Sequence, residues 1–241
     1  MTLHQSITAP QALHPSLWLA SQLAHASTRC VDTGHPTLSS QLPGGGWPTG
    51  TLIDLMLQQS GIGELRLLRP ALAAGRRRIV LLQPPHPPQA LALAALGLAP
   101  SQLIWIRTSG TSGSSDALWA AEQVLRSGSC GAVLFWQNHA RGETLRRLHL
   151  AAHSGETLFF MLRPLAAAQD SSPAPLRLSL RPAPGGLDIE FVKRRGPQRD
   201  TPLFLPLPLP LTPFLLQRHA TLDRALFAPV TARSILPELV Q

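Results

Sequence analysis

Between residues 42 and 162, short apolar runs alternate with helix-like patterns, and this alternation limits the possible folds of the chain. Five runs of strand length are apolar on successive residues, namely Leu52–Leu57, Arg78–Leu82, Leu103–Arg107, Ala132–Trp136 and Thr157–Leu162. Helical spacing of apolar residues fills the intervals, near Gly63–Ala74, Gln89–Leu96, Ser115–Arg126 and Gly142–His153. Continuous apolar strands are typical of strands buried on both faces. The alternation therefore predicts an α/β fold with a predominantly parallel sheet flanked by helices.

Glycine and proline mark the expected helix ends. Gly75, Gly97, Gly128 and Gly155 each follow a helical pattern, where a C-terminal cap favours a residue that tolerates positive φ. Pro70 lies inside the first of these helices, and we expect it to kink or shorten that helix.

The segments outside this alternation have a different character. Residues 1–40 read as an N-terminal helical extension, with a helix from Pro15 to about Ser27 and then a loop. Residues 41–195 form the core, which closes with a β-hairpin of Leu176–Arg181 and Leu187–Lys193 around a Pro/Gly turn. Leucines at 176, 178 and 180 alternate with Arg177, Ser179 and Arg181, so we expect the leucine face to be buried and the polar face to be wet.

Residues 196–241 form a Pro/Leu-rich C-terminal tail. Prolines at 206, 208 and 210 remove amide donors, which excludes a central strand and favours an extended, polyproline-like conformation. Leu205, Leu207 and Leu209 alternate with them, as in a peptide that docks on a partner or in a strap that packs on its own domain. Residues 214–227 form a further amphipathic helical pattern.

Residues 42–74 have the layout of a strand, a phosphate-binding loop and a helix. They read LPGGGWPTG, then TLIDLML, then QQSGIGELRLLRPALAA. Gln58 stands where such a loop has its first glycine, and Gly61 and Gly63 complete the turn. Glu64 takes the position of the lysine that reaches the outer phosphates, and Leu65 that of the magnesium-binding Ser/Thr. A carboxylate repels a triphosphate and a leucine cannot bind magnesium. The loop is therefore a degenerate phosphate loop.

Charge and cysteine content bear on partners and location. The net charge of +8 comes from twenty Arg and the single Lys193 against thirteen acidic residues, and it favours contact with nucleic acid or with an acidic protein. Two basic clusters, Arg76-Arg77-Arg78 and Lys193-Arg194-Arg195, are candidates for DNA or partner contact, or else solvated loops. Cys30 and Cys130 form no C-x-x-C pair, and no leader or membrane-length apolar run is present, which fits a cytoplasmic protein.

Histidine and tryptophan give weaker indications. His149 and His153 have a spacing that can share a metal, but without a third ligand nearby a plain surface pair is the better interpretation, and we expect no metal site and no cofactor. Trp47, Trp105, Trp119 and Trp136 could stack the bases of a nucleic acid. Trp105 and Trp136 lie in expected strands and should be core residues, whereas Trp47 in the Gly/Pro turn is the one more open to solvent.

Several of these motifs together resemble the core of a RecA-type recombinase. Four motifs carry a more specific resemblance, namely PGGGWP, GIGELRLL, DALWAAEQVLRSG running into CGAVLFW, and FVKRRG. They resemble the ImuA family of RecA/SulA-like proteins of bacterial translesion synthesis. The resemblance covers about residues 40–195. It implies a RecA-like fold for this core.

The resemblance also indicates where recombinase chemistry would lie. The general base would follow the second strand, where Gln83, Pro84, Pro85 and His86 stand, and the magnesium-binding Asp would end the fourth strand, where Trp136 and Gln137 stand. With the phosphate-loop groups also replaced, we expect no ATPase activity.

The family implies a non-catalytic accessory role in SOS-induced mutagenesis, through contacts with ImuB, a DnaE-type polymerase and RecA. Two alternatives stay open at this point. One is a SulA-like inhibitor of cell division that binds FtsZ, and the other is a nucleotide-dependent enzyme with an unorthodox phosphate site.

Overall fold

The computed structural model describes residues 29–108, 113–195, 199 and 201–208. The chain divides into a unit of residues 1–208 and a unit of residues 209–241, and all described residues belong to the first unit. The expected helices at 15–27 and 214–227 lie outside the described residues.

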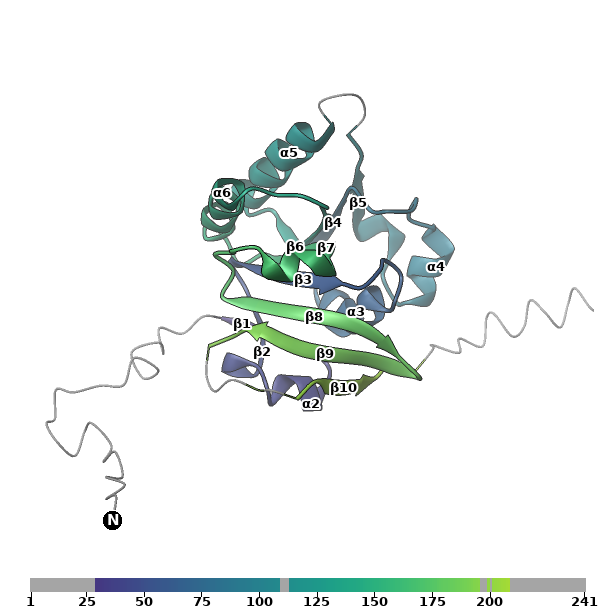
Figure 1. The fold of residues 1–241 in the computed structure, drawn as a ribbon. Helices are drawn as coiled ribbons and strands as arrows, with labels where there is room; N and C mark the ends of the chain where they lie inside the picture. The colour runs from purple at the N-terminus through teal and green to yellow at the C-terminus, as the bar shows by residue number, and fades with distance from the viewer. Residues whose placement is uncertain (1–28, 109–112, 196–198, 200, 209–241) are drawn as a thin grey trace, which may run out of the picture. The chain divides into compact units, whose positions relative to one another are not determined.

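An eight-stranded sheet in the order β10-β9-β8-β3-β7-β6-β4-β5 forms the centre of the first unit (Figure 1). Its strands are β3 (Thr51–Leu57), β4 (Arg78–Leu82), β5 (Leu103–Ile106), β6 (Cys130–Trp136), β7 (Leu158–Pro164), β8 (Leu176–Ala183), β9 (Gly186–Lys193) and β10 (Leu203–Pro206). The six strands from β8 to β5 are parallel to one another. Beyond β8, β9 pairs antiparallel with β8, and β10 pairs antiparallel with β9. The predicted α/β class with a mostly parallel sheet is confirmed.

Helices cover both faces of the sheet. Leucines of α3 (Glu64–Ala74), α4 (Ala90–Ala95) and α2 (Pro36–Ser39) pack in the core cluster on one face. The other face packs on α5 (Gly113–Ser127) and α6 (Gly142–Ala152). A 3₁₀ turn, η4 (Leu165–Gln169), lies on the same face as α5 and α6, over β3 and β8. The other described 3₁₀ turns are η2 (Pro43–Gly45) and η3 (Pro100–Gln102). The central strands β3, β4, β6 and β7 are therefore buried on both faces, which is why their apolar runs are continuous.

The segment before the sheet differs from the prediction. Residues 31–40 were expected to form a loop, but β1 (Cys30–Asp32) pairs antiparallel with β2 (Gly46–Pro48) and α2 follows it. This pairing brings Trp47 onto the sheet, where it is fully buried and meets Phe160 edge to face at 5.3 Å. The prediction that Trp47 is open to solvent was wrong, because its burial comes from a strand pairing that the Gly/Pro turn does not reveal.

Local predictions from glycine and proline were correct only in part. Gly97 and Gly128 have positive φ, as expected after α4 and α5. Gly75 has φ −83°, and Gly155 is not among the positive-φ residues, so neither forms a left-handed cap. Helix α3 continues through Pro70 to Ala74 instead of stopping there.

The first part of the tail belongs to the sheet. Residues Leu203–Pro206 pair with β9 as an edge strand, so the polyproline expectation was wrong there. Pro206 is tolerated because an edge strand leaves every second amide without a sheet partner. A Cβ at Gly186 would lie 2.1 Å from the carbonyl oxygen of Leu205, so this close pairing requires glycine. Leu205 and Leu207 are buried against the domain, as in the strap interpretation, and Leu209 lies outside the described residues.

Candidate functional site

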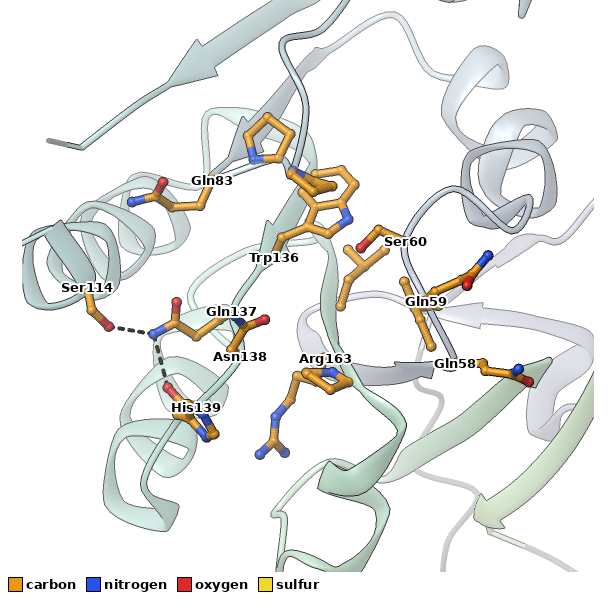
Figure 2. Close-up of a pocket in the computed structure, with 15 residues that line it drawn as sticks. Gln58, Gln59, Ser60, Gln83, Ser114, Trp136, Gln137, Asn138, His139 and Arg163 are labelled. Atoms are coloured by element: carbon orange, nitrogen blue, oxygen red, sulfur yellow. Dashed lines mark hydrogen bonds between the residues drawn. The ribbon is translucent and has the colours of Figure 1, made fainter. Parts of the chain in front are cut away.

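A cavity of about 770 Å³ opens at the carboxyl ends of β3, β4, β6 and β7 (Figure 2). In open α/β sheets, ligands bind in crevices outside the carboxyl ends of the strands. Fifteen residues line the cavity: Leu57, Gln58, Gln59, Ser60, Gln83, Pro84, Pro85, Ser114, Trp136, Gln137, Asn138, His139, Leu162, Arg163 and Pro164.

Three positions that the sequence singled out meet at this cavity. Gln58 begins the loop after β3, Gln83 follows β4, and Gln137 follows β6. Gln58 is the first position of the degenerate phosphate loop. Gln83 stands at the position of the expected general base, and Gln137 stands beside the position of the expected magnesium ligand. Parallel strands bring them together because their carboxyl ends share one edge of the sheet.

The polar lining of the cavity consists mostly of neutral groups. It includes the side-chain amides of Gln58, Gln59, Gln83, Gln137 and Asn138 and no carboxylate. Gln137 Nε2 donates to Ser114 Oγ at 2.6 Å and to the carbonyl oxygen of His139 at 3.0 Å (Figure 2). Such amides can donate and accept hydrogen bonds, but they have no proton that titrates near neutral pH.

Gln83 has a strained backbone. Its φ of +50° is the one positive φ of a residue other than glycine in the described ranges. Its side-chain amide donates to Thr108 Oγ1 at the start of the next loop. Non-glycine residues in the left-handed region concentrate at ligand sites and other functional positions. The edge therefore keeps the geometry of a binding site while its chemistry is neutral.

Six polar lining residues were not singled out as site residues from the sequence. They are Gln59, Ser60, Ser114, Asn138, His139 and Arg163. Four of them directly follow β3 or β6, and the rule that sites gather after parallel strands would have found these four. Ser114 lies near the start of α5, and only the fold brings it to Gln137.

Charged side chains lie buried beside the cavity. Asp54 on β3 is fully buried, and its Oδ2 accepts from Arg177 Nε at 3.1 Å and from Arg163 Nη1 at 3.4 Å. Arg163 Nη2 also donates to Asp170 Oδ2 at 2.6 Å, and Arg177 Nη2 donates to the carbonyl oxygen of Ala167 at 2.8 Å. The guanidinium of Arg163 points away from Trp136 (Figure 2). Both guanidinium groups are thus committed to internal partners.

The prediction of a wet polar face on β8 was wrong at two of three positions. Arg177 and Ser179 are buried, whereas Arg181 is exposed. Turn η4 contacts β8 on this side, Asp54 supplies a partner for Arg177, and Glu190 Oε2 accepts from Ser179 Oγ at 3.0 Å. The polar alternation therefore marks an internal charge cluster rather than a surface.

The degenerate phosphate loop is closed by its own glutamate. The buried carboxylate of Glu64 accepts from the amide of Gly61 at 2.8 Å and from the amide of Gly63 at 3.1 Å. Both glycines have positive φ, +87° and +125°, which aims their amides inward. Glu64 is also the first residue of α3, where the helix dipole stabilises a negative charge. An internal anion thus occupies the donors that a phosphate would need.

The two basic clusters lie at the opposite edge of the sheet. Arg78 begins β4 and Lys193 ends the antiparallel strand β9, so both stand at the amino ends of the parallel strands. Arg77 donates to the carbonyl oxygen of Gly128, and Lys193 Nζ donates to that of Ser172 at 3.2 Å. Arg194 donates to the carbonyl oxygen of Gln41 and stacks on Phe191 at 4.7 Å. Neither cluster contributes to the cavity.

The histidine pair is not a plain surface pair. His149 is half-buried, and its Nδ1 lies 3.3 Å from both the amide nitrogen of Leu52 and Thr51 Oγ1. Burial lowers the pKa of His149 below its ordinary value, and the positive charges of His153 and Lys193 lower it further. Within the described ranges, no three His, Cys, Asp or Glu residues are grouped so that they could hold a metal ion.

Among the described residues, two tryptophans are open to solvent. Trp105 was expected in the core but is 41% exposed, because β5 is the last strand of the sheet and has one neighbour only. Arg107 lies over its ring at 5.1 Å. Trp119 on α5 is 63% exposed, and Trp136 is buried as predicted.

None of the helices in the described part of the chain combines the length and apolarity that crossing a membrane requires. A scan against models of protein families gave no match to the chain. A search of curated proteins likewise gave none.

Proposed function

We propose that this chain is a non-catalytic, RecA-like accessory protein of SOS-induced translesion synthesis. It acts by binding other proteins, in a complex with an ImuB-type subunit, an error-prone DnaE-type polymerase and RecA. The motifs that resemble the ImuA family support the assignment. A mostly parallel sheet with helices on both faces is compatible with it.

The observation that carries the non-catalytic part is the closed phosphate loop. A nucleotide phosphate would have to displace the Glu64 carboxylate from the amides of Gly61 and Gly63. Hydrogen bonds to a charged group contribute about 1.5–3 kcal/mol each, and the displaced carboxylate would then face the like charge of the phosphate. The loop therefore favours its internal anion over a nucleotide.

The neighbouring positions support the same proposal. A general base must accept a proton from the attacking water, and the amide of Gln83 does not do so at neutral pH. Gln137 stands beside the position where the recombinase resemblance places a carboxylate for magnesium, and an amide brings no negative charge to that place. Loss of one preorganised group already costs orders of magnitude in rate.

Two measurements on the purified protein test the non-catalytic part. We expect no ATP turnover above a no-protein control, and no rise in melting temperature with millimolar Mg-ATP, because a ligand stabilises a protein only in proportion to its binding. Steady turnover that Glu64→Ala abolishes would overturn the proposal and favour an enzyme with an unorthodox phosphate site.

A pull-down from DNA-damaged bacterial cells tests the assembly role. The full chain is compared with a version that ends at Pro208, which keeps β10 and its buried leucines in place. Truncation after Arg195 would remove an entire strand and confuse unfolding with loss of contact. Recovery of the polymerase subunits or RecA supports the proposal, and recovery of FtsZ in their place overturns it in favour of a division inhibitor.

A further inference from the structure

The topology of the sheet turns two separate basic clusters into one surface. Arg76 and Arg77 precede β4 and Arg78 is its first residue. Lys193 is the last residue of β9, paired with Arg177 of β8, and Arg194 and Arg195 follow it. Both clusters therefore lie at the edge where β3, β4, β5, β6, β7 and β8 begin, which we call the amino edge. Arg29, beside Thr49 just before β3, lies at this edge as well.

The amino edge has a strong excess of positive charge. Its described segments are 29–30, 48–51, 75–78, 99–103, 127–130, 153–158, 171–176 and 193–195, which are the approaches to the parallel strands and the end of β9. They contain seven Arg and Lys residues against one acidic residue, Glu156, which forms an ion pair with Arg29. The surplus is therefore not neutralised along the edge.

The basic side chains divide into anchored and available ones. The guanidinium groups of Arg77 and Arg194 donate to backbone carbonyls, and Lys193 does so through one of its three N–H bonds. Arg76, Arg78 and Arg195 are exposed, and no described residue accepts a hydrogen bond from their guanidinium groups or pairs with them. The anchored residues fix the edge, and the available ones can bind an external anion.

The spacing of the available groups fits an extended polyanion. Five strand-to-strand steps separate β4 from β9 in the sheet, which at about 4.8 Å per step is roughly 24 Å. One DNA strand in a duplex carries a phosphate about every 3.4 Å, so roughly seven phosphates span this distance. A single small anion could meet only one of the two clusters.

The composition of the edge favours nucleic acid over an acidic protein. Protein interfaces have an apolar, often aromatic centre. The exposed large apolar residues of the described chain are Leu91, Trp105, Trp119, Leu150, Val192 and Phe204, and none of them lies in the segments of the amino edge. Phosphate contacts need only charge and hydrogen-bond donors.

We propose that the amino edge binds the phosphate backbone of nucleic acid independently of sequence, through Arg76, Arg78, Lys193 and Arg195. This binding goes beyond the proposed role in protein assembly and does not depend on it. It uses the edge opposite the cavity, so the closed phosphate loop and the binding surface are separate.

The test measures fluorescence anisotropy of a labelled 20-nucleotide single strand with the full-length protein at several salt concentrations. The binding variant combines Arg76→Ala, Arg78→Ala and Arg195→Ala. A matched control removes the same charge from the opposite edge, where the parallel strands end and which we call the carboxyl edge. It combines Arg107→Ala, Arg141→Ala and Arg181→Ala, all exposed in the structure. Thermal unfolding of both variants confirms that they fold.

We expect the logarithm of the binding constant of the unmodified protein to fall with the logarithm of salt concentration with a slope of roughly −3. The binding variant should reduce this slope to roughly −1 and weaken binding about 100-fold at ~0.1 M salt, since each lost contact accounts for about 0.7 of the slope. The control variant should retain a slope close to that of the unmodified protein.

Two results would overturn the proposal. An equal loss in both variants would show that net charge alone attracts the strand. Absence of measurable binding by the unmodified protein at low salt would leave the amino edge to an acidic protein partner.

Discussion

Both edges of the sheet carry polar and charged side chains, but these side chains differ in whether they have partners inside the protein. At the carboxyl edge the hydrogen-bonding groups have internal partners: Glu64 satisfies the loop amides, Gln137 bonds to Ser114, and Arg163 is held by Asp54 and Asp170. At the amino edge, Arg76, Arg78 and Arg195 are exposed, and no described residue pairs with their guanidinium groups. The carboxyl edge therefore holds the cavity with ordered side chains, whereas the positive charge that could attract an anionic ligand lies at the amino edge.

The largest expected loss of stability at the carboxyl edge comes from removing the Asp54 carboxylate. Asp54→Ala should lower the free energy of unfolding by about 3–5 kcal/mol, because it leaves Arg163 and Arg177 buried without their shared carboxylate. Urea unfolding measures the loss. Asp170→Ala is the control: its side chain is 56% exposed, and its removal should cost no more than about 1 kcal/mol. Equal costs for the two variants would refute the idea that Asp54 holds this edge together.

Glu64 tests whether the phosphate loop is closed by its own anion. Glu64→Ala should lower the free energy of unfolding by about 2–3 kcal/mol, because the buried amide of Gly63 and the more exposed amide of Gly61 lose a charged acceptor. Glu64→Gln should cost less, since its amide oxygen still accepts one bond. Millimolar pyrophosphate should raise the melting temperature of the alanine variant and leave the unmodified protein unchanged. A rise of the same size in both would mean that Glu64 does not block the loop.

His149 provides a pH test near the amino edge. Its pKa is lowered in the folded state, so the unfolded chain takes up the proton first as the pH falls. Its contribution to stability is complete above the ordinary histidine value of 6.5 and decreases as the pH falls below that value. Protonation would also remove the Nδ1 acceptor near Leu52. We expect a smaller effect than at Glu64.

Urea unfolding at pH 7.5 and pH 5.5 measures this contribution. His149→Gln should lose less stability between the two pH values than the unmodified protein. His153→Gln, which changes the exposed neighbour, should behave more like the unmodified protein. If the His149 variant keeps the whole pH dependence, other groups are responsible for it.

The arginines of the amino edge should have the smallest effect on stability. The combined change Arg76→Ala, Arg78→Ala and Arg195→Ala should alter the free energy of unfolding by less than about 0.5 kcal/mol per residue, because exposed side chains without partners contribute little. Urea unfolding of this variant beside Asp54→Ala measures the contrast between the edges directly. A loss comparable with that of Asp54→Ala would show that these arginines hold the fold.

Much of the fold could be predicted because it rests on local patterns. The expected strand Leu52–Leu57 is observed as Thr51–Leu57, and the expected helix Gly142–His153 as Gly142–Ala152. Apolar periodicity finds such elements because burial on both faces selects residues along the whole strand. Trp47 and Trp105 were assigned to the wrong environments, since strand pairing and position in the sheet decide exposure.

Sequence patterns alone identified the α/β class, the replacement of the phosphate-loop residues and most helices and strands, but not β1, β2, α2 or β10. The pairing of Asp54 with two arginines and the shared edge of residues 76–78 and 193–195 emerged only from the fold, because these groups are far apart along the chain. The bonds of Glu64 to Gly61 and Gly63 are local, but they depend on backbone angles of the loop that apolar periodicity does not specify. Periodicity and turn chemistry act over a few residues, whereas a shared carboxylate or a common sheet edge joins side chains more than a hundred residues apart, and only the order and direction of the strands bring them together.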